Sequence, residues 1–486
     1  MFFRFFVKRG KLELRITYYS NSQKFLYDFQ HIIRAFYPGA ELSFGNGGDI
    51  HFEAHFDGFN VRIQAEMENK EIVVKNFILT DDDHESKRIF GRNLYDILKT
   101  LTGKELPWGI LTGIRPTKIA YPLVESNLPD KEASEYLQRE YYISKKKSHF
   151  LLEVAKNETN ILNRVDSSAA CLYIGIPICP TKCLYCSFSC HELTKRIESL
   201  LSLYTQALLT ELEKTYKLIE ENKNKIVAIY FGGGSPAVIG VQNIKRIFES
   251  LFANLDVKDI RETTFEAGRP DTINRELLEL LALYKKDFNI RLCINPQTSN
   301  DKTLQIIGRN HTFDDIKKAF ELASEYGLEN INSDVILGLP NEKEEDFKKT
   351  IYDVLSLNPA SITVHTLSIK RASLLRFKWQ DYWFMDEDTV NCLLDWTKSV
   401  LEEKGYIPYY MYRQKNMIGN FENVGYSKRG FEGLYNVMIM QEKHNIYACG
   451  AKAVSKFIFE NDRIERVFNP ADIQIYISRI LNIERF

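Results

Sequence analysis

Short apolar runs alternate with longer segments of helical period between residues 172 and 368, and this alternation limits the folds open to the chain. Near-continuous apolar strands separated by amphipathic helices indicate a parallel sheet that is covered on both faces. The six units predict a partial (β/α)6 barrel, and an open doubly wound sheet has the same local signature. In either fold, ligands bind at the carboxyl ends of the strands. The apolar runs are LYIGIPI (172–178), IVAIYFGGG (226–234), TTFEAG (263–268), IRLCINPQ (290–297), INSDVILGLP (331–340) and SITVHTLS (361–368), and the helical stretches between them include 200–221, 275–284 and 344–357.

The regions on either side of the barrel, which we place at 166–404, have different patterns. Residues 1–165 predict an α+β accessory domain with a connector. Its opening, 1–19, indicates a strand pair rather than a signal peptide, because charged residues interrupt the apolar run. Residues 405–486 begin with a segment rich in Tyr, Asn and Gly, which predicts a loop-rich cap that covers the substrate at the barrel mouth. In the accessory domain we expect antiparallel strands at 11–19, 48–56, 59–67 and 70–79, and a helix near 23–36.

Composition excludes some classes of protein. Lys and Arg number 64 against 65 Asp and Glu, so no net field favours a nucleic acid partner. No apolar run approaches the roughly 20 residues that span a bilayer. With no export signal, eight cysteines indicate a reducing compartment, where clustered thiols usually bind metal or take part in catalysis. We therefore expect a cytoplasmic protein.

Four of the eight cysteines fall in the segment PICPTKCLYCSFSC, residues 177–190. All four thiols could form a closed, tetrahedral zinc site. All four could also bind a ferredoxin-like cluster, although the first gap is one residue longer than usual. In a third arrangement, Cys179, Cys183 and Cys186 hold three irons of a [4Fe–4S] cube and leave the fourth iron open. Spacing alone leaves these alternatives open.

The context of this segment resembles the radical S-adenosylmethionine (SAM) superfamily. The cysteines follow the first strand, Tyr185 directly precedes the third cysteine, and YFGGGSP ends the second strand. The resemblance implies that Cys179, Cys183 and Cys186 bind a [4Fe–4S] cluster whose open iron chelates SAM, and that Cys190 is a bystander. It also implies that Tyr185 packs near the SAM adenine, and that Gly233, Gly234 and Ser235 lie near the SAM amino group. Reductive cleavage of SAM then gives methionine and a 5′-deoxyadenosyl radical.

Further polar residues match, in order and context, SAM-binding positions of the coproporphyrinogen-oxidase-like branch of that superfamily. This resemblance implies that Arg309 pairs with the SAM carboxylate, and that Asp334 or Gln297 binds the ribose hydroxyls. Such pairings suit the chemistry, since Arg forms a bidentate fork with a carboxylate. The matching cofactor-binding candidates are Tyr173, Glu266, Gln297, Arg309 and Asp334, with His365 added near the end of the sixth run.

A closer resemblance covers nearly the whole chain and points to the HemZ-type oxygen-independent coproporphyrinogen III oxidases (dehydrogenases). It implies oxidative decarboxylation of two propionates of coproporphyrinogen III to vinyl groups, giving protoporphyrinogen IX, with an electron donor such as flavodoxin or ferredoxin. The candidates for binding the substrate carboxylates are Lys370, Arg371, Arg413 and Lys415. The sequence departs from better-known oxidases at Gly175, where they have His, and at Phe188, where they have a further Cys. The resembling segments are 108–119, 266–273, 294–304, 363–373 and 412–426.

Two other functions share the same core. One is a haem chaperone, as implied for HemW-like relatives. The other is a radical SAM methyltransferase that acts on a tetrapyrrole or another substrate, since related barrels bind two SAM molecules. Neither the cysteine segment nor the barrel separates these functions from the oxidase.

Overall fold

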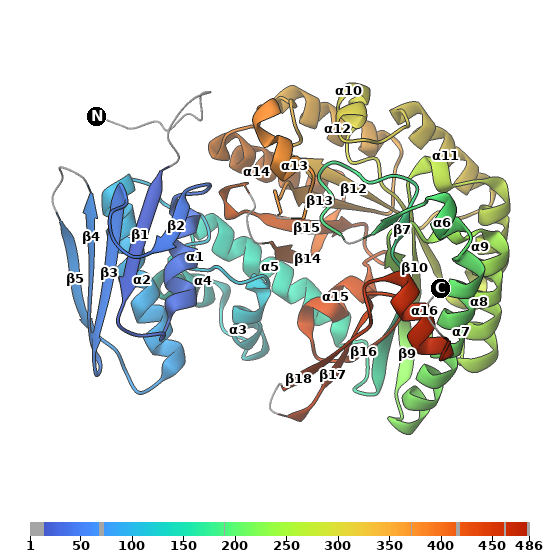
Figure 1. The fold of residues 1–486 in the computed structure, drawn as a ribbon, viewed down its shortest axis with the longest axis horizontal. Coiled ribbons are helices and arrows are strands. Elements are labelled where there is room, and N and C mark those ends of the chain that lie inside the picture. Colours follow the sequence, from blue (N-terminus) through green and yellow to red (C-terminus); the bar gives the residue numbers. More distant parts are fainter. Residues whose placement is uncertain are drawn as a thin grey trace. The chain divides into compact units, whose positions relative to one another are not determined.

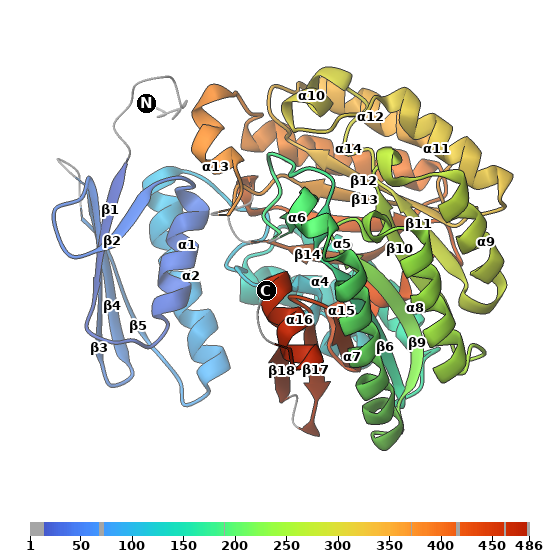
Figure 2. The same ribbon diagram turned by 45° about the vertical axis from the view of Figure 1, so that its right-hand side comes forward.

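The computed structural model describes residues 14–67, 72–188, 190–370, 372–414, 418–460 and 463–483. The chain divides into two compact units. The smaller unit comprises Met1–Ala155 with Arg413–Phe421, and the larger unit comprises Lys156–Tyr412 with Glu422–Phe486. Figures 1 and 2 show the elements of both units, coloured along the chain.

The smaller unit is built on a five-stranded sheet with the order β2-β1-β3-β4-β5. Helices α1 and α2 pack on one face of this sheet (Figure 1), where Phe29, Phe52 and Phe90 are buried. Its strands are β1 Arg15–Ser20, β2 Glu41–Phe44, β3 Ile50–Asp57, β4 Asn60–Met67 and β5 Val73–Ile78. Its helices are α1 Leu26–Phe36, α2 Asp83–Thr102, α3 Tyr121–Glu125 and α4 Asp130–Tyr141, followed by α5 Lys145–Leu162, which continues into the larger unit.

The antiparallel prediction is correct for one part of this sheet only. Strands β3, β4 and β5 pair antiparallel, but β1 pairs parallel with both β2 and β3. The reason is that α1 follows β1 and carries the chain back along the sheet before β2 begins. Of the predicted strand pair in 1–19, residues 1–13 lie outside the described part of the chain, and Arg15–Ser20 is one strand.

The larger unit contains six parallel strands that lie side by side in chain order, β6-β9-β10-β11-β12-β13. A doubly wound sheet would reverse its strand order at a switch point, and this sheet does not. The prediction of a partial (β/α)6 barrel is therefore confirmed. The strands are β6 Ala169–Ile176, β9 Lys225–Gly233, β10 Glu262–Gly268, β11 Ile290–Ile294, β12 Ile331–Leu337 and β13 Ser361–Thr366.

Helices connect these strands and cover the outer face of the sheet, as Figures 1 and 2 show for α7, α8, α9, α11 and α12. Side-chain caps fix several starts: Asn274 accepts from Leu277 N at α9, and Thr312 forms a capping box with Asp315 at α11. The helices are α6 Lys195–Glu198, α7 Leu201–Glu221, α8 Val241–Asn254, α9 Arg275–Phe288, α10 Asp301–Ile306, α11 Phe313–Glu325, α12 Glu344–Ser356, α13 Leu375–Lys378 and α14 Glu387–Glu403.

The chain after residue 405 is not loop-rich, so that prediction is wrong. Strand β15 pairs antiparallel with β13, and β16 pairs parallel with β6, so the tail extends both edges of the barrel sheet. A segment rich in Tyr need not be a loop, because Tyr is a good strand former, and here Tyr409 and Tyr410 are buried in β14. The elements are β14 Ile407–Arg413, β15 Glu422–Ser427, α15 Leu434–Gln441, β16 Asn445–Cys449, β17 Val454–Ile458, β18 Ile464–Phe468 and α16 Ile473–Leu481.

Candidate active site at the carboxyl ends of the barrel strands

The cysteines follow the carboxyl end of β6, in a segment of residues 177–193 that we call the cysteine loop. Two short strands, β7 Ile178–Cys179 and β8 His191–Glu192, pair parallel and bring its two ends together. A turn closes its middle, where Cys186 N donates to Cys183 O at 3.1 Å. Cys179, Cys183 and Cys186 are all partly exposed. The loop thus presents three accessible thiols at the end of the first barrel strand.

Contacts from the following strand ends hold the cysteine loop in place. Arg269, just after β10, donates to Thr181 Oγ1 at 2.7 Å and also forms an ion pair with Asp271. Leu184 N donates to Ile307 O at 2.9 Å, and Leu375 N donates to Leu184 O at 2.9 Å. The position of the loop is therefore set by protein contacts, from segments far apart in the sequence.

The thiols differ in their surroundings. A hydrogen bond from Cys190, with a smaller contribution from the positive charge of Arg269, lowers the pKa of Cys179 to about 7, against the effect of burial. Burial raises the pKa of Cys186. Cys190 donates to Gly233 O at 2.9 Å, and its hydrogen bond to Cys179 raises its own pKa. Cys190 thus contacts one of the predicted ligands, and its role as a bystander stays a prediction.

The described residues contain no group of three or more His, Cys, Asp or Glu side chains already arranged to hold a metal ion. The thiols of Cys179, Cys183 and Cys186 are nevertheless close enough to influence one another electrostatically. Metal-binding loops seldom have their final geometry without the metal, because binding the metal supplies the energy that orders the ligands. We therefore expect the three thiols to converge when the metal group binds.

The glycines at the end of β9 are required by the packing of the strands. A Cβ at Gly234 would lie 2.3 Å from Ile178 O, and Gly233 has φ 106°. Neither position tolerates a side chain, whether or not a ligand is present. The next residue, Ser235, is buried, and its polar groups help to lower the pKa of Cys179. The predicted contact of this strand end with SAM stays a prediction.

Polar side chains from β10, β11, β12 and β13 meet beside this loop. We call Glu266, Asn295, Gln297, Arg309, Asp334 and His365 the strand-end group. Glu266 accepts hydrogen bonds from Tyr230 and, at 3.1 Å, from Asn295 Nδ2. Burial and the negative charge of Asp334 raise the pKa of Glu266. Arg309 donates to Asn295 O and lies close enough to Cys183 for the two groups to interact electrostatically, so it lies between the strand-end group and the cysteine loop.

Asp334 is held by neighbours on both carboxylate oxygens. Asn332 Nδ2 donates to Oδ1 at 2.8 Å, and His365 Nε2 lies 3.5 Å from Oδ2. Burial alone would raise the pKa of Asp334, but the hydrogen bond and charge of His365, with the hydrogen bond from Asn332, lower it. His365 Nδ1 in turn lies 3.1 Å from Tyr412 Oη. A hydrogen-bonded series therefore runs from β12 through β13 to β14.

Gln297 has a different arrangement. Its φ is 67°, which is uncommon for a residue other than glycine, and its backbone bridges to β12 through Gln297 N to Asp334 O and Ile336 N to Gln297 O, both 2.9 Å. Its side chain is buried, and Oε1 has no hydrogen-bond partner. Strained backbone and an unpaired buried acceptor are both typical of ligand-binding positions, and the contact of Gln297 with SAM stays a prediction. Between the two candidates for the ribose hydroxyls, this favours Gln297 over Asp334.

The two predicted tyrosines lie on different sides of the site. Tyr185 lies close to Arg309 and Cys183, and burial raises its pKa. Tyr173 stacks on Tyr230 and Tyr435, with ring centroids 6.1 and 6.4 Å apart. A Cβ at Gly175 would lie 3.1 Å from the Tyr173 ring and 3.3 Å from Cys449 O, so a side chain at this position would require its neighbours to shift by a few tenths of an ångström.

Only some of the predicted substrate residues can be placed. Lys370 lies near Cys186, and burial lowers its pKa. Arg413 is buried in the smaller unit, where it donates to Leu111 O at 2.7 Å and to Asn420 O and lies over the Trp108 ring. These contacts anchor the end of β14, and the role of Arg413 in binding substrate stays a prediction. Arg371 and Lys415 lie outside the described residues.

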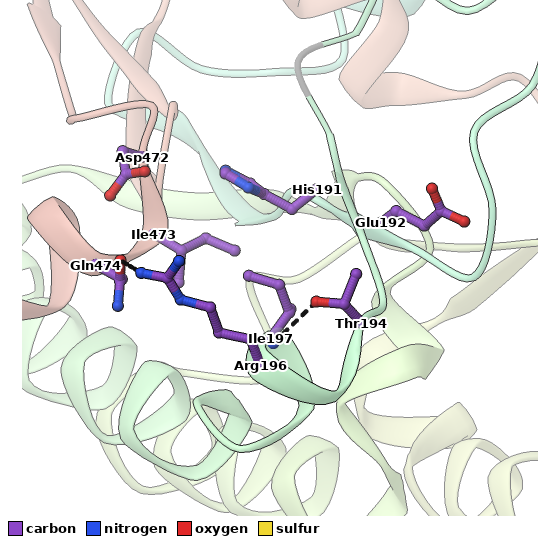
Figure 3. Close-up of a pocket in the computed structure, with 8 residues that line it drawn as sticks. All are labelled: His191, Glu192, Thr194, Arg196, Ile197, Asp472, Ile473 and Gln474. Carbon is purple, nitrogen blue, oxygen red and sulfur yellow. Dashed lines mark hydrogen bonds between the residues drawn. The ribbon is translucent and has the colours of Figure 1, made fainter. Parts of the chain in front are cut away.

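A pocket of about 320 Å³ lies between β8, α6 and the start of α16 (Figure 3). Arg196 Nη2 donates to Gln474 Oε1 across it at 2.6 Å. His191 and Glu192 line it from the far end of the cysteine loop. None of its lining residues belongs to the strand-end group or carries a predicted thiol ligand, so it does not extend the candidate active site.

Comparisons with known proteins identify relatives of this chain. Residues 173–354 match the model of the radical SAM superfamily. The chain is 36% identical over 466 residues to the oxygen-independent coproporphyrinogen-III oxidase-like protein HemZ of Bacillus subtilis, which covers 93% of this chain and 92% of that protein. It is 28% identical over 297 residues to the heme chaperone HemW of Haemophilus influenzae, covering 61% of this chain and 72% of that protein. The solved structure of coproporphyrinogen III oxidase HemN from Escherichia coli, a radical SAM enzyme, is 20% identical with a TM-score of 0.48, covering 67% of this chain and 71% of that one.

The match over residues 173–354, which lie in the larger unit, therefore identifies this chain as a radical SAM enzyme. Because the similarity to HemZ extends through 93% of the sequence, the chain belongs to the family of that oxygen-independent coproporphyrinogen-III oxidase-like protein. The cofactors that define the superfamily are a [4Fe–4S] cluster and SAM.

The residues present fit both cofactors. Three soft thiolate donors suit an iron–sulfur cluster. Beside them, Gln297 Oε1 and Arg309 Nε are buried without hydrogen-bond partners, as expected of groups that wait for a polar ligand. Cys179, Cys183 and Cys186 would hold the cluster, and the strand-end group would hold SAM. Sequence reasoning missed Asn295, Arg269 and Tyr230; a polar residue two positions before Gln297, in an otherwise apolar strand end, was the available signal for Asn295.

Proposed function

We propose that this protein catalyses the oxidative decarboxylation of coproporphyrinogen III to protoporphyrinogen IX. The observation that carries the proposal is the 36% identity to a coproporphyrinogen-III oxidase-like protein across 93% of the chain, which includes both compact units. Similarity to the haem chaperone covers 61% of the chain. The residue pattern beyond the shared core thus supports the oxidase.

The reaction converts each of two propionate side chains, –CH2–CH2–COO⁻, to a vinyl group. One hydrogen atom leaves the β-carbon, CO2 leaves from the carboxylate, and one electron passes to an acceptor. When bound, the cluster and SAM supply the one-electron chemistry that removes the hydrogen atom. The chain's own residues must hold SAM against the cluster and keep the substrate β-carbon in contact with the SAM 5′-carbon, since hydrogen abstraction needs near-attack geometry.

We propose that the segment around α13 contributes to substrate binding. Leu375 N donates a hydrogen bond to Leu184 O of the cysteine loop, and this bond fixes the segment next to the predicted cluster ligands. Leu374 and Phe377 are exposed by 44% and 80%, and the helix carries Arg376 and Lys378. Exposed apolar side chains with neighbouring cations suit a tetrapyrrole, which is apolar at its centre and carries carboxylates at its edge.

The remaining expectations complete the proposal. The cluster needs an electron donor, for which a flavodoxin or ferredoxin is suitable, and the reduced thiols suit the cytoplasm. The nearly neutral charge balance supports a small-molecule substrate rather than a nucleic acid. None of the helices in the described part of the chain has both the length and the apolar character that crossing a bilayer demands. We retain 166–404 as the catalytic barrel, 1–165 as an accessory domain and 405–486 as the region that covers the substrate.

The experiment is anaerobic incubation of the cluster-loaded protein with SAM, a reductant and coproporphyrinogen III deuterated at the propionate β-carbons. We expect faster formation of 5′-deoxyadenosine, transfer of deuterium into it, and release of CO2 in step. Unlabelled 5′-deoxyadenosine together with tight haem binding would favour the chaperone. S-adenosylhomocysteine with a methylated product would favour a methyltransferase.

A further inference from the structure

Asn295 lies where the strand-end group converges. It follows β11 directly and is 5% exposed. Its backbone N–H donates to Gly268 O at 2.9 Å, which ties it to the end of β10. It is thus fixed at the carboxyl end of the sheet, between the strand that carries Glu266 and the strand that carries Asp334.

Every polar atom of Asn295 is used. Nδ2 donates to Glu266 Oε2 at 3.1 Å, and Oδ1 accepts from Asp334 N at 3.2 Å. Its backbone O accepts from Arg309 Nη1. The three residues that Asn295 joins were each predicted as SAM contacts, and they come from three different parts of the barrel. Each side-chain and backbone polar atom of Asn295 therefore already has a partner within the protein.

We propose that Asn295 is a positioning residue for SAM. Its side-chain amide sets the distance between Glu266 and the β12 backbone at Asp334, and its backbone carbonyl oxygen orients Arg309. This inference rests on the proposed SAM-dependent function. Without the amide, Glu266 Oε2 and Asp334 N would each lose a partner in a site where unpaired polar groups are costly. The two segments would then no longer be held at a fixed distance.

The chain offers a matched control in Asn224. Its side chain also bridges segments, donating to Ser168 O at 3.1 Å and accepting from Asn445 Nδ2 at 3.0 Å and Tyr447 Oη at 2.7 Å. These contacts lie at the opposite ends of β6 and β9, where the strands begin. Asn224→Ala therefore removes a comparable set of hydrogen bonds away from the strand-end group.

The test compares SAM binding by the cluster-loaded full chain for wild type, Asn295→Ala, Asn295→Asp and Asn224→Ala. Equilibrium dialysis gives the affinity, and the change that SAM causes in the electron paramagnetic resonance spectrum of the reduced cluster reports its placement. We expect Asn295→Ala to weaken SAM binding about tenfold and to alter that spectral change. Asn224→Ala should lower the melting temperature without either effect. The isosteric Asn295→Asp keeps the acceptor for Asp334 N but removes the donor to Glu266, and it should also weaken binding, which keeps the test decisive if the alanine variant does not fold.

A double-mutant cycle with Glu266→Gln distinguishes positioning from general loss of stability. If Asn295 acts through Glu266, the affinity of the double variant for SAM will be no lower than that of the single variant with the lower affinity. Fully additive losses would overturn the role through Glu266, and unchanged SAM affinity in both Asn295 variants would overturn the inference while leaving the proposed function intact. Wild-type protein that fails to bind SAM would overturn the proposed function, and the inference with it.

Discussion

The cysteine loop and the strand-end group are neighbours in the site, but they are built differently. In the loop, Cys179 ends the short strand β7, Cys183 and Cys186 lie in the turn that follows, and the described residues show no group of side chains arranged to hold a metal ion. In the strand-end group, Glu266, Asp334 and His365 are already bonded to protein partners. We therefore expect the cluster to bring the thiols of the loop together, whereas the sheet already holds the strand-end group in place.

The largest expected effect is on the loop. Cys183→Ala should abolish the visible absorbance of the cluster and all SAM cleavage, because three thiolates are the minimum for this site. Cys190→Ala is the matched control, since Cys190 contacts Cys179 from the same loop yet is outside the predicted ligand set. Absorbance and iron analysis of the reconstituted protein measure the outcome. A Cys190→Ala variant that loses its metal, or a purified protein that holds zinc, would contradict the three-thiolate arrangement.

The second prediction concerns Glu342, a buried carboxyl group near Gln297, and its effect on the stability of the protein. Glu342 is completely buried, its Oε1 accepts from Thr298 beside Gln297, and its Oε2 has no partner. Burial raises the pKa of Glu342 to about 7. Since the folded protein holds this proton more tightly than the unfolded chain, stability should fall as the pH rises from about 4.5 to about 7 and then level off.

Glu342→Gln removes that ionisation. We expect the variant to be more stable than wild type by about 3 kcal/mol at pH 8 and to differ little from it at pH 4. Urea denaturation of the cluster-free protein at both pH values provides the measurement. Glu279→Gln, on the exposed face of α9, should change neither value. Equal stability of Glu342→Gln and wild type at pH 8 would show that the carboxylate has a partner or solvent access in solution.

The third prediction concerns Arg309, which joins the two regions. Arg309→Ala should leave the cluster content near that of wild type and weaken SAM binding about tenfold, because it removes a charge-assisted contact to a carboxylate. Arg246→Ala, on the exposed face of α8, is the control and should bind SAM normally. If Arg309→Ala unfolds under conditions where cluster-free wild type stays folded, Arg309 serves the fold and not the cofactor.

The barrel could be predicted from the sequence because its signal is local. Each apolar run, such as 226–234, has the length and composition of a buried parallel strand, and β9 occupies nearly the same residues. The thiols could be found because four cysteines in one segment are rarely explained by packing. Pairing direction in the smaller unit could not be predicted, because a strand such as β1 has the same alternation whether its neighbours are parallel or antiparallel.

Residues that act through other residues were the hardest to predict. Asn295 and Arg269 have no motif of their own, and their roles come from contacts with Glu266 and Thr181, which are distant in the sequence. Arg413 was predicted from its charge in a family-like segment, and the structure adds hydrogen bonds to backbone carbonyl oxygens that the sequence did not indicate. Chemical character can be read from one residue, whereas its partners depend on the fold.

The last strands of the chain add to both edges of the barrel sheet, and this has a consequence for how the protein is made. On the ribosome, the six barrel strands emerge before β15 and β16, so both edges of the sheet stay open until the tail has been synthesised. Open strand edges are templates for pairing with another chain. A nascent or prematurely terminated chain would therefore be prone to aggregate through both edges at once, and its protection during synthesis falls to chaperones until the final strands have docked.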